Sequence, residues 1–224
     1  MIVTVVFDID DTLYLEREYV RSGFNAADRW LSANRGIEGL FERAWRAFAA
    51  GARGRIFDDV VAELGIGDES LVAELVEVYR SHRPAITLLP DARECLEMLV
   101  GRTGLACVSD GPAPSQGAKA SALGLDRWLD PIVLTDELGP GFGKPHKRGF
   151  EIVERTAPVG VCVYVADNPH KDFAGPKELG WRTLRIRRPG GLHFEAESGS
   201  DVDGERPDLA GLAEELGLRA EIGA

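Results

Sequence analysis

The first nine residues restrict the fold of this chain more than any other segment does. Residues 2–9 form a short, mostly apolar run rich in β-branched side chains, and Asp10, Asp11 and Thr12 end it. Such a run, bounded by polar residues, is typical of a strand buried on both faces of a parallel sheet. The next run of this kind is residues 105–108. The sequence therefore predicts an α/β protein whose sheet is interrupted after its first strand.

The segment between these two strands has the pattern of helices. Residues 19–31 carry aromatic and aliphatic side chains at helical spacing, and Pro84 ends a later helix. We therefore expect a helical domain at residues 15–84, inserted into a core that consists of residues 1–14 and 85–224.

From Pro90 onward, apolar runs of strand length alternate with helical patterns. This alternation indicates βα units and a parallel sheet. We expect strands at residues 105–108, 132–134, 161–165 and 182–186, and helices at residues 92–99, 116–123, 149–155, 172–179 and 209–216.

Acidic residues outnumber basic ones. There are 37 Asp and Glu residues and 26 Lys and Arg residues, which gives a formal net charge of −11. Nucleic acid and anionic membrane surfaces repel a chain this acidic, so we expect neither as a partner. The same repulsion acts on an anionic metabolite. A phosphate-binding site here therefore needs a local positive charge from a metal, a lysine or backbone N–H groups.

The cysteines and the first residues bear on the compartment. Cys95, Cys107 and Cys162 have no CxxC spacing, and an odd count of cysteines suits a reducing environment. The first residues contain no basic region followed by a small-residue cleavage site, and no apolar run approaches the length of a membrane span. These features predict a cytoplasmic protein.

Two aspartates, Asp8 and Asp10, close the first strand. In an extended strand, positions two apart point to the same side, so both carboxylates can face one small volume at the carboxyl end. Ligands of open α/β sheets bind in the crevice at that edge. Two carboxylates this close repel each other unless a cation lies between them, and a hard divalent ion such as Mg²⁺ fits. An acidic turn without function remains the alternative.

Three further polar motifs follow later strands. Ser109 and Asp110 end the second strand, where a hydroxyl next to a glycine can bind an oxyanion or form an ordinary turn. Lys144 lies in a Gly- and Pro-rich loop, and it suits phosphate oxygens or is a solvated lysine. Asp167 and Asp172 follow a later strand, as a metal ligand with its partner or as helix caps. All four motifs lie at carboxyl ends of strands or in the loops that follow.

The order of these motifs resembles the haloacid dehalogenase-like superfamily, in its phosphatase branch. The resemblance extends over residues 1–187, and four motifs in order are far more specific than one. Ala166 departs from the pattern, in which glycine usually precedes the acid. The resemblance implies a doubly wound parallel sheet of order 5-4-1-2-3 with an inserted helical cap domain of the first type. The matching residues are Asp8, Asp10 and Thr12 in the first motif, Ser109 in the second, Lys144 and Pro145 in the third, and Asp167 and Asp172 in the fourth.

The resemblance also implies a mechanism. Asp8 is then the nucleophile and forms an aspartyl-phosphate, while Asp10 protonates the leaving alkoxide and later activates the hydrolytic water. This is the chemistry of a magnesium-dependent phosphatase that hydrolyses a small phosphorylated metabolite. The implied ligands of Mg²⁺ are Asp8, the backbone carbonyl of Asp10, and Asp167, supported by Asp172 and Thr12, and the implied phosphate-binding residues are Ser109, Asp110 and Lys144.

Other activities of the superfamily make different demands on these positions. Dehalogenases need no acid at the position of Asp10, and phosphonoacetaldehyde hydrolases use a cap lysine, which residues 15–84 lack. A phosphomutase keeps both aspartates, so phosphomutase activity remains an alternative. A phosphoacceptor signalling or binding protein without turnover is a second alternative. The cap is expected to close over the site as a lid. For His146, His170 and Lys171 a structural or surface role is expected, and the sequence has no signal for an oligomeric state.

Overall fold

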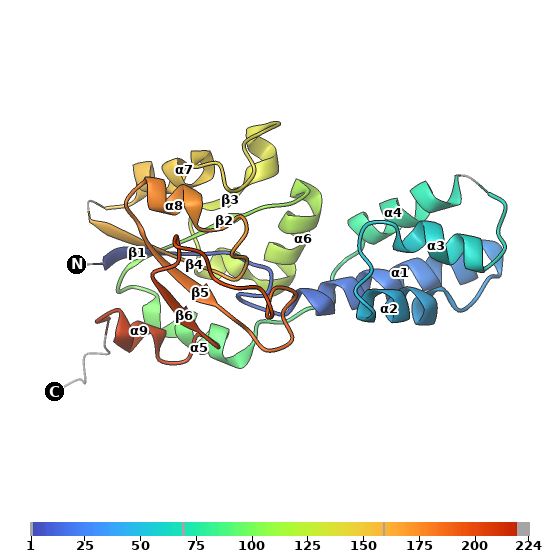
Figure 1. The fold of residues 1–224 in the computed structure, drawn as a ribbon, viewed down its shortest axis with the longest axis horizontal. Coiled ribbons are helices and arrows are strands. Elements are labelled where there is room, and N and C mark those ends of the chain that lie inside the picture. Colours follow the sequence, from blue (N-terminus) through green and yellow to red (C-terminus); the bar gives the residue numbers. More distant parts are fainter. Residues whose placement is uncertain (1, 69, 159, 219–224) are drawn as a thin grey trace. The chain divides into compact units, whose positions relative to one another are not determined.

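The computed structural model describes residues 2–68, 70–158 and 160–218. Its strands are β1 (Ile2–Phe7), β2 (Gly104–Ser109), β3 (Ile132–Leu134), β4 (Val161–Ala166), β5 (Arg182–Ile186) and β6 (Gly204–Arg206). Within the described residues these strands form one parallel sheet in the order β3-β2-β1-β4-β5-β6 (Figure 1). Val5, Val6 and Phe7 in the central strand β1 are fully buried. Because helices lie on both faces of the sheet, the side chains of β1 are buried on both sides, which is why its run is apolar.

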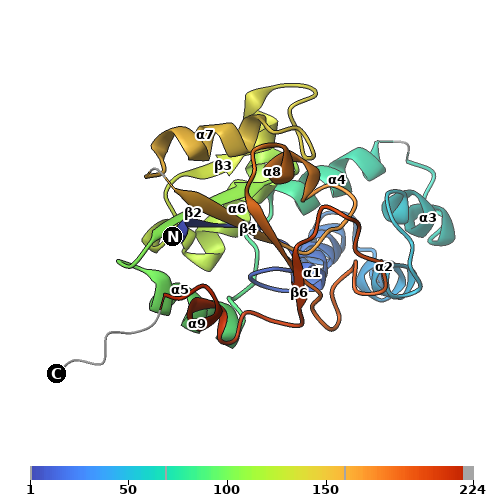
Figure 2. The ribbon, with the colours of Figure 1, turned by 60° about the vertical axis from the view of Figure 1, so that its left-hand side comes forward.

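Helices cover both faces of this sheet. Figures 1 and 2 show α7 (Arg148–Thr156) and α8 (Ala174–Glu178) on one face, and α5 (Pro90–Leu99) and α9 (Leu212–Glu215) on the other. Phe150 of α7 packs edge-on against Tyr164 of β4, with 4.8 Å between the ring centroids. The remaining elements of the core are α6 (Ala113–Leu123) and the 3-10 turns η1 (Leu125–Arg127) and η2 (Thr135–Leu138).

The predicted fold class is confirmed. Read from β5 to β3, the strand order is the expected 5-4-1-2-3, and β6 adds one parallel strand beyond β5. The sequence did not predict β6 because it is three residues long and includes the charged Glu205 and Arg206. It has no apolar run that could mark it as a strand.

The chain divides into two compact units, a core unit made of Met1–Glu16 with Ile86–Ala224, and a helical unit, Arg17–Ala85. The division falls within two residues of the expected domain boundaries. The function of the helical unit as a lid stays a prediction. The helices of this unit are α1 (Glu16–Arg35), which begins one residue before it, α2 (Leu40–Ala49), α3 (Ile56–Glu63) and α4 (Leu71–Ser81). The sequence analysis did not predict α3.

The helical unit has its own aromatic core. The rings of Phe24, Phe57 and Tyr79, from three different helices, lie in mutual contact, with centroid distances of 5.7 and 5.8 Å. Aromatic side chains at helical spacing in the sequence therefore mark an apolar interior that this unit builds for itself.

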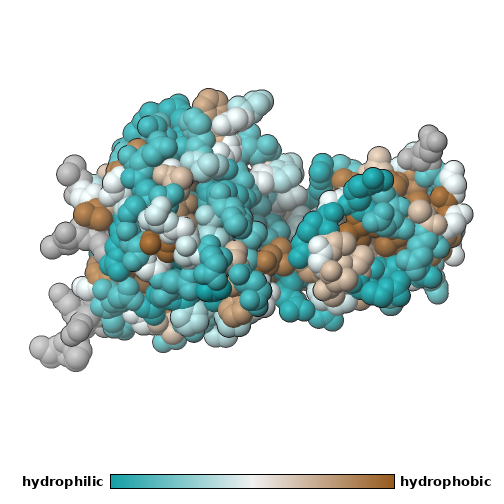
Figure 3. All heavy atoms as spheres, in the orientation of Figure 1, coloured by the Kyte–Doolittle hydropathy of each residue, from teal (hydrophilic) through white to brown (hydrophobic). Residues whose placement is uncertain are grey.

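The surface agrees with the acidic composition. On the face shown in Figure 3, hydrophilic residues cover most of the core unit, and apolar residues appear in small separate patches. Among the helices of the described ranges, none combines the length and the apolar character that crossing a bilayer demands.

Candidate active site

The candidate site lies at the carboxyl edge of the sheet, beside the two central strands. β1 pairs with β2 on one side and with β4 on the other, so the direction of winding reverses there. A crevice opens at such a switch point. Asp8 directly follows β1, and its N–H donates to the carbonyl of Val165 in β4 at 2.9 Å. Asp167 directly follows β4, so the sheet brings two acids that are distant in sequence to the same edge.

Three carboxylates meet at this edge. Asp8, Asp167 and Asp172 each have an oxygen within 4.8 Å of the others, and all three side chains are buried. Burial raises the pKa of Asp8 to about 6, although the charge of Lys144 opposes it. Burial and the charges of Asp172 and Asp8 raise the pKa of Asp167 well above its usual value. Within the described residues the Asp167 carboxylate has no hydrogen bond or ion pair. This buried group of oxygen donors fits a hard divalent cation such as Mg²⁺.

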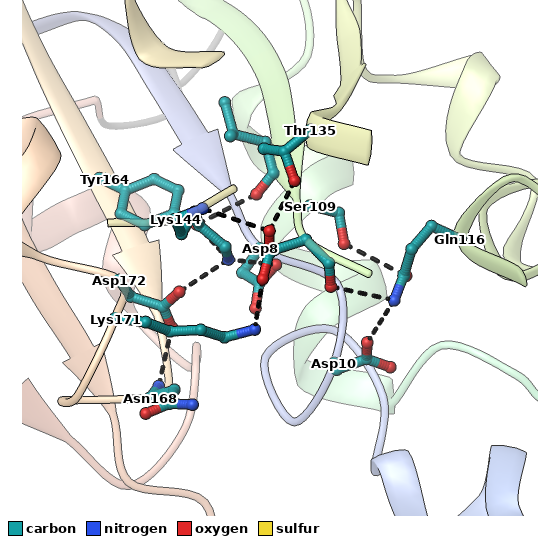
Figure 4. A network of polar contacts seen from close by, with 12 residues as sticks. Asp8, Asp10, Ser109, Gln116, Thr135, Lys144, Tyr164, Asn168, Lys171 and Asp172 are labelled. Carbon is teal, nitrogen blue, oxygen red and sulfur yellow. Dashed lines mark hydrogen bonds and ion pairs between the residues drawn. The ribbon is translucent and has the colours of Figure 1, made fainter. Parts of the chain in front are cut away.

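Lys144 supplies a positive charge inside this group (Figure 4). Its ammonium lies 3.0 Å from Oδ1 of Asp8 and 2.7 Å from Oδ1 of Asp172. It also donates a hydrogen bond of 3.0 Å to the hydroxyl of Tyr164. Burial lowers the pKa of a lysine, but Asp172 and Asp8 hold the pKa of Lys144 well above its usual value. Lys144 is therefore charged, and one ammonium cannot neutralise three ionised carboxylates.

The carboxylate of Asp10 lies beside this group and is bound by α6. The ammonium of Lys119 is 2.8 Å from both carboxylate oxygens, and Nε2 of Gln116 donates to Oδ2 at 3.1 Å. The hydroxyl of Tyr14 donates to Oδ1. Burial raises the pKa of Asp10, but the charge and hydrogen bonds of Lys119 outweigh burial and hold that pKa below its usual value. Asp10 is thus an oriented, ionised carboxylate, and its function as a metal ligand through the backbone carbonyl stays a prediction.

Ser109 and Asp110, at the end of β2, belong to the same network. The buried hydroxyl of Ser109 donates to Oε1 of Gln116 at 3.2 Å. Oδ1 of Asp110 accepts hydrogen bonds from the hydroxyl of Thr135 at 2.6 Å and from the N–H of Lys144 at 3.2 Å. The carboxylate of Asp110 therefore holds the loop that carries Lys144. That Ser109 and Asp110 contact phosphate stays a prediction.

Asp172 and Thr12 were expected to support the metal ligands. Oδ2 of Asp172 accepts the N–H of Asn168 at 2.8 Å, so this fully buried carboxylate orders the loop after β4. Thr12 is also fully buried but lies in another network, where its carbonyl accepts a hydrogen bond of 2.8 Å from Arg188. The hydroxyl of Thr12 has no hydrogen-bond partner among the described residues. Support of the acids by Thr12 therefore stays a prediction.

Sequence reasoning missed the contacts that α6 makes with the motifs. Gln116 and Lys119 are three positions apart, so they share one face of this helix. The signal available in the sequence was a glutamine and a lysine at that spacing, in the helix that follows Ser109. For Tyr14 the signal was its position four residues after Asp10. Lys171 was expected to have a structural or surface role. In the structure its ammonium lies 2.9 Å from Oδ2 of Asp110, so it is part of the site's polar network.

The fold and the site together define a Rossmann-like protein with an acidic site at the switch point of its sheet. The chain belongs to the haloacid dehalogenase-like hydrolase family, whose sequence model matches residues 2–180. The predicted family and the prediction that the chain is a hydrolase are confirmed.

Two similar proteins are named glyceraldehyde 3-phosphate phosphatase. The chain is 29% identical to the one from Methanocaldococcus jannaschii, over 90% of this chain and 92% of that protein. It is 30% identical to the one from Methanopyrus kandleri, over 91% of each chain. Among solved structures, a putative HAD-hydrolase from Bacillus subtilis bound to magnesium shares the fold, with a TM-score of 0.66 at 19% identity, over 96% of this chain and 98% of that chain. The phosphatase relatives support the expected enzyme class, a phosphoric monoester hydrolase.

Proposed function

We propose that this protein is a magnesium-dependent phosphatase that hydrolyses a small phosphate monoester through a phosphorylated Asp8. The observation that carries the proposal is the buried contact of 3.0 Å between Asp8 and Lys144, beside the carboxylates of Asp167 and Asp172. A nucleophilic carboxylate can approach an anionic phosphate only where positive charge compensates both. This edge of the sheet combines such a carboxylate with an ammonium and with oxygen donors for a cation.

Asp8 is the nucleophile in the proposed reaction. Its oxygen forms a bond to phosphorus while the bond from phosphorus to the ester oxygen breaks, and water then hydrolyses the aspartyl-phosphate. Lys144 and the hydroxyl of Ser109 bind the phosphoryl oxygens. Because Lys144 is locked between Asp8 and Asp172, its charge is in place before the substrate arrives. Mg²⁺, held by Asp8, Asp167 and the carbonyl of Asp10, would supply further positive charge at the phosphoryl group.

Asp10 transfers the proton in this proposal. In the free protein Lys119 keeps its carboxylate ionised, so Asp10 must take up a proton as the anionic substrate binds. A nearby negative charge favours that uptake because it raises the pKa of a carboxyl group. Asp10 then donates the proton to the leaving oxygen and takes one back from the hydrolytic water.

The names of the two relatives suggest where to begin the search for the substrate. Both are glyceraldehyde 3-phosphate phosphatases, and this chain matches about nine tenths of each. A three-carbon sugar phosphate is therefore the first substrate that we propose for this chain. It is a small phosphorylated metabolite, as the sequence predicts.

A phosphate-release screen tests the proposal. The panel contains glyceraldehyde 3-phosphate, other triose phosphates, hexose phosphates and nucleoside monophosphates, each assayed with MgCl₂ and with excess EDTA. We expect release from a triose phosphate that requires MgCl₂ and that falls by at least about 10³-fold in Asp8→Asn. Asp126→Asn is the matched control, since Asp126 is exposed. Full turnover in Asp8→Asn, or in EDTA, contradicts the proposal, and an isomerised ester without free phosphate indicates a phosphomutase.

A further inference from the structure

The lysines of the site differ in how accessible they are. The side chain of Lys144 is fully buried and that of Lys119 is 4% exposed, and each already faces carboxylates of the protein. The side chain of Lys171 is 34% exposed, and its ammonium pairs with one oxygen of Asp110, whose side chain is 22% exposed. Of these three ammonium groups, that of Lys171 is therefore the one that solvent and an incoming anion can reach.

The backbone of Lys171 is held in place by a tight turn after β4. The N–H groups of Lys171 and Asp172 both donate to the carbonyl of Asn168, at 3.4 and 3.1 Å, and Asp172 accepts the N–H of Asn168 in return. Figure 4 shows the stem of Lys171 extending from this turn toward Asp8. The positive charge of Lys171 opposes the rise in the pKa of Asp8 that burial causes, although less than Lys144 does. A fixed backbone with a flexible four-carbon stem allows the ammonium to move while its origin stays in place.

Asp110 keeps this ammonium at the site in the free protein. One oxygen of Asp110 is taken by the hydroxyl of Thr135 and the N–H of Lys144, and the other faces Lys171 at 2.9 Å. Gly143, which precedes Lys144, lets the carboxylate of Asp110 come close to this loop, because a Cβ at position 143 would lie 2.7 Å from Oδ1 of Asp110. A partly exposed ion pair of this kind contributes modestly to stability, so an anion can replace Asp110 as the partner of Lys171 at a small cost.

From this arrangement we infer that Lys171 is a substrate-binding residue, whose ammonium contacts an anionic oxygen of the phosphoester while Asp110 holds it at the site before binding. This inference rests on the proposed phosphatase function and adds a contact to it. In this arrangement Lys171 provides an accessible positive charge for an anionic substrate in a chain whose net charge is strongly negative.

Binding of inorganic phosphate, measured by calorimetry in 10 mM MgCl₂, tests the inference without turnover. We expect Lys171→Met to weaken binding by about 10- to 100-fold, the range typical of a hydrogen bond to a charged group, and Lys171→Arg to keep most of the affinity. KM for the best ester should rise by a similar factor, with kcat changed by less than about threefold. Lys177→Met is the matched control, because Lys177 is 33% exposed and pairs with Asp203 at 2.6 Å.

A double variant separates substrate contact from simple neutralisation of Asp110. If Lys171 binds the phosphate itself, Asp110→Asn combined with Lys171→Met binds it as weakly as Lys171→Met alone. Restored affinity in the double variant overturns the inference, since Lys171 would then only cancel the charge of Asp110. Wild-type affinity in Lys171→Met overturns it as well. A wild type that binds phosphate but releases none from any ester contradicts the proposed function and leaves the binding test of Lys171 valid.

Discussion

At the scale of single residues, three donors from two parts of the chain hold Asp10. Lys119 and Gln116 reach its carboxylate from α6, and Tyr14 reaches it from the segment that follows β1. These contacts fix the direction of the Asp10 carboxylate before a substrate binds. Gln116 also accepts the hydroxyl of Ser109, which couples the proposed acid to the proposed phosphate-binding serine.

Replacing Asp10 should affect substrates according to their leaving groups. We expect Asp10→Asn to lower kcat for alkyl phosphates by about 10²- to 10⁴-fold, because an alkoxide cannot leave without a proton. With 4-nitrophenyl phosphate the first step should survive, since the phenolate leaves unprotonated, and rapid mixing should show a burst of nitrophenolate followed by slow hydrolysis. An equal loss in the first step for both kinds of ester would rule out acid catalysis by Asp10.

At the scale of elements, β5 ties the last part of the sheet to the site through Arg185. This side chain is fully buried and donates to the carbonyl of Asp167 at 3.0 Å, and to those of His193 and Ala196 at 2.7 and 2.8 Å. It also pairs with Glu205 in β6 at 3.3 Å. One arginine therefore holds both the segment that leads to β6 and the backbone of a proposed metal ligand.

Two arginines of β5 make a matched pair for a stability test. We expect Arg185→Met to lower the free energy of unfolding by about 3–5 kcal/mol, because it leaves one buried and two part-buried carbonyls without a donor. Arg182→Met should cost about 1 kcal/mol or less, since Arg182 is 39% exposed and forms a surface ion pair with Glu215. Urea unfolding measures both. Equal losses in the two variants would show that the contacts of Arg185 contribute no more than a surface pair.

At the scale of the whole molecule, the buried acids link folding to pH and to metal. The pKa of Asp8 rises from 3.8 to about 6 in the folded chain, so the folded state holds this proton more tightly than the unfolded state does. The stability contributed by this group is therefore lost as pH rises from about 4 to about 6. The raised pKa of Asp167 acts in the same direction. A cation that binds the ionised carboxylates offsets this loss.

Thermal stabilisation by Mg²⁺ should therefore grow between pH 5 and pH 7. The metal competes with protons for Asp8 and Asp167, so its affinity rises as these groups ionise. At 100 times its Kd, Mg²⁺ should stabilise the fold by about 2.7 kcal/mol, which raises Tm by about 5–10 °C for a chain of this size. Scanning calorimetry with MgCl₂ or EDTA at each pH measures this shift, and Asp167→Asn should reduce it. A shift that is constant across this range would argue against a site made of these carboxylates.

The sequence by itself determined the order of strands β1 to β5, most of the helices between them, and the places of the four motifs. Apolar runs of strand length mark β1, β2 and β4, and the acids that end β1 and β4 must lie at one edge of a parallel sheet. These are local signals, because burial on both faces demands a continuous apolar run wherever such a strand occurs. The positions of Asp8 and Asp167 could be predicted for this reason, and that of Lys144 from the motif order that resembles the family.

Only the tertiary structure decided which side chains surround those motifs. Lys119 and Asp10 are 109 residues apart, and Lys171 and Asp110 are 61 apart, yet each pair is in contact. Arg185 and β6 are likewise defined by what they meet in the folded chain. A polar side chain has the same local pattern whether it faces solvent or a distant carboxylate, because its partner comes from packing between elements and not from periodicity along the chain.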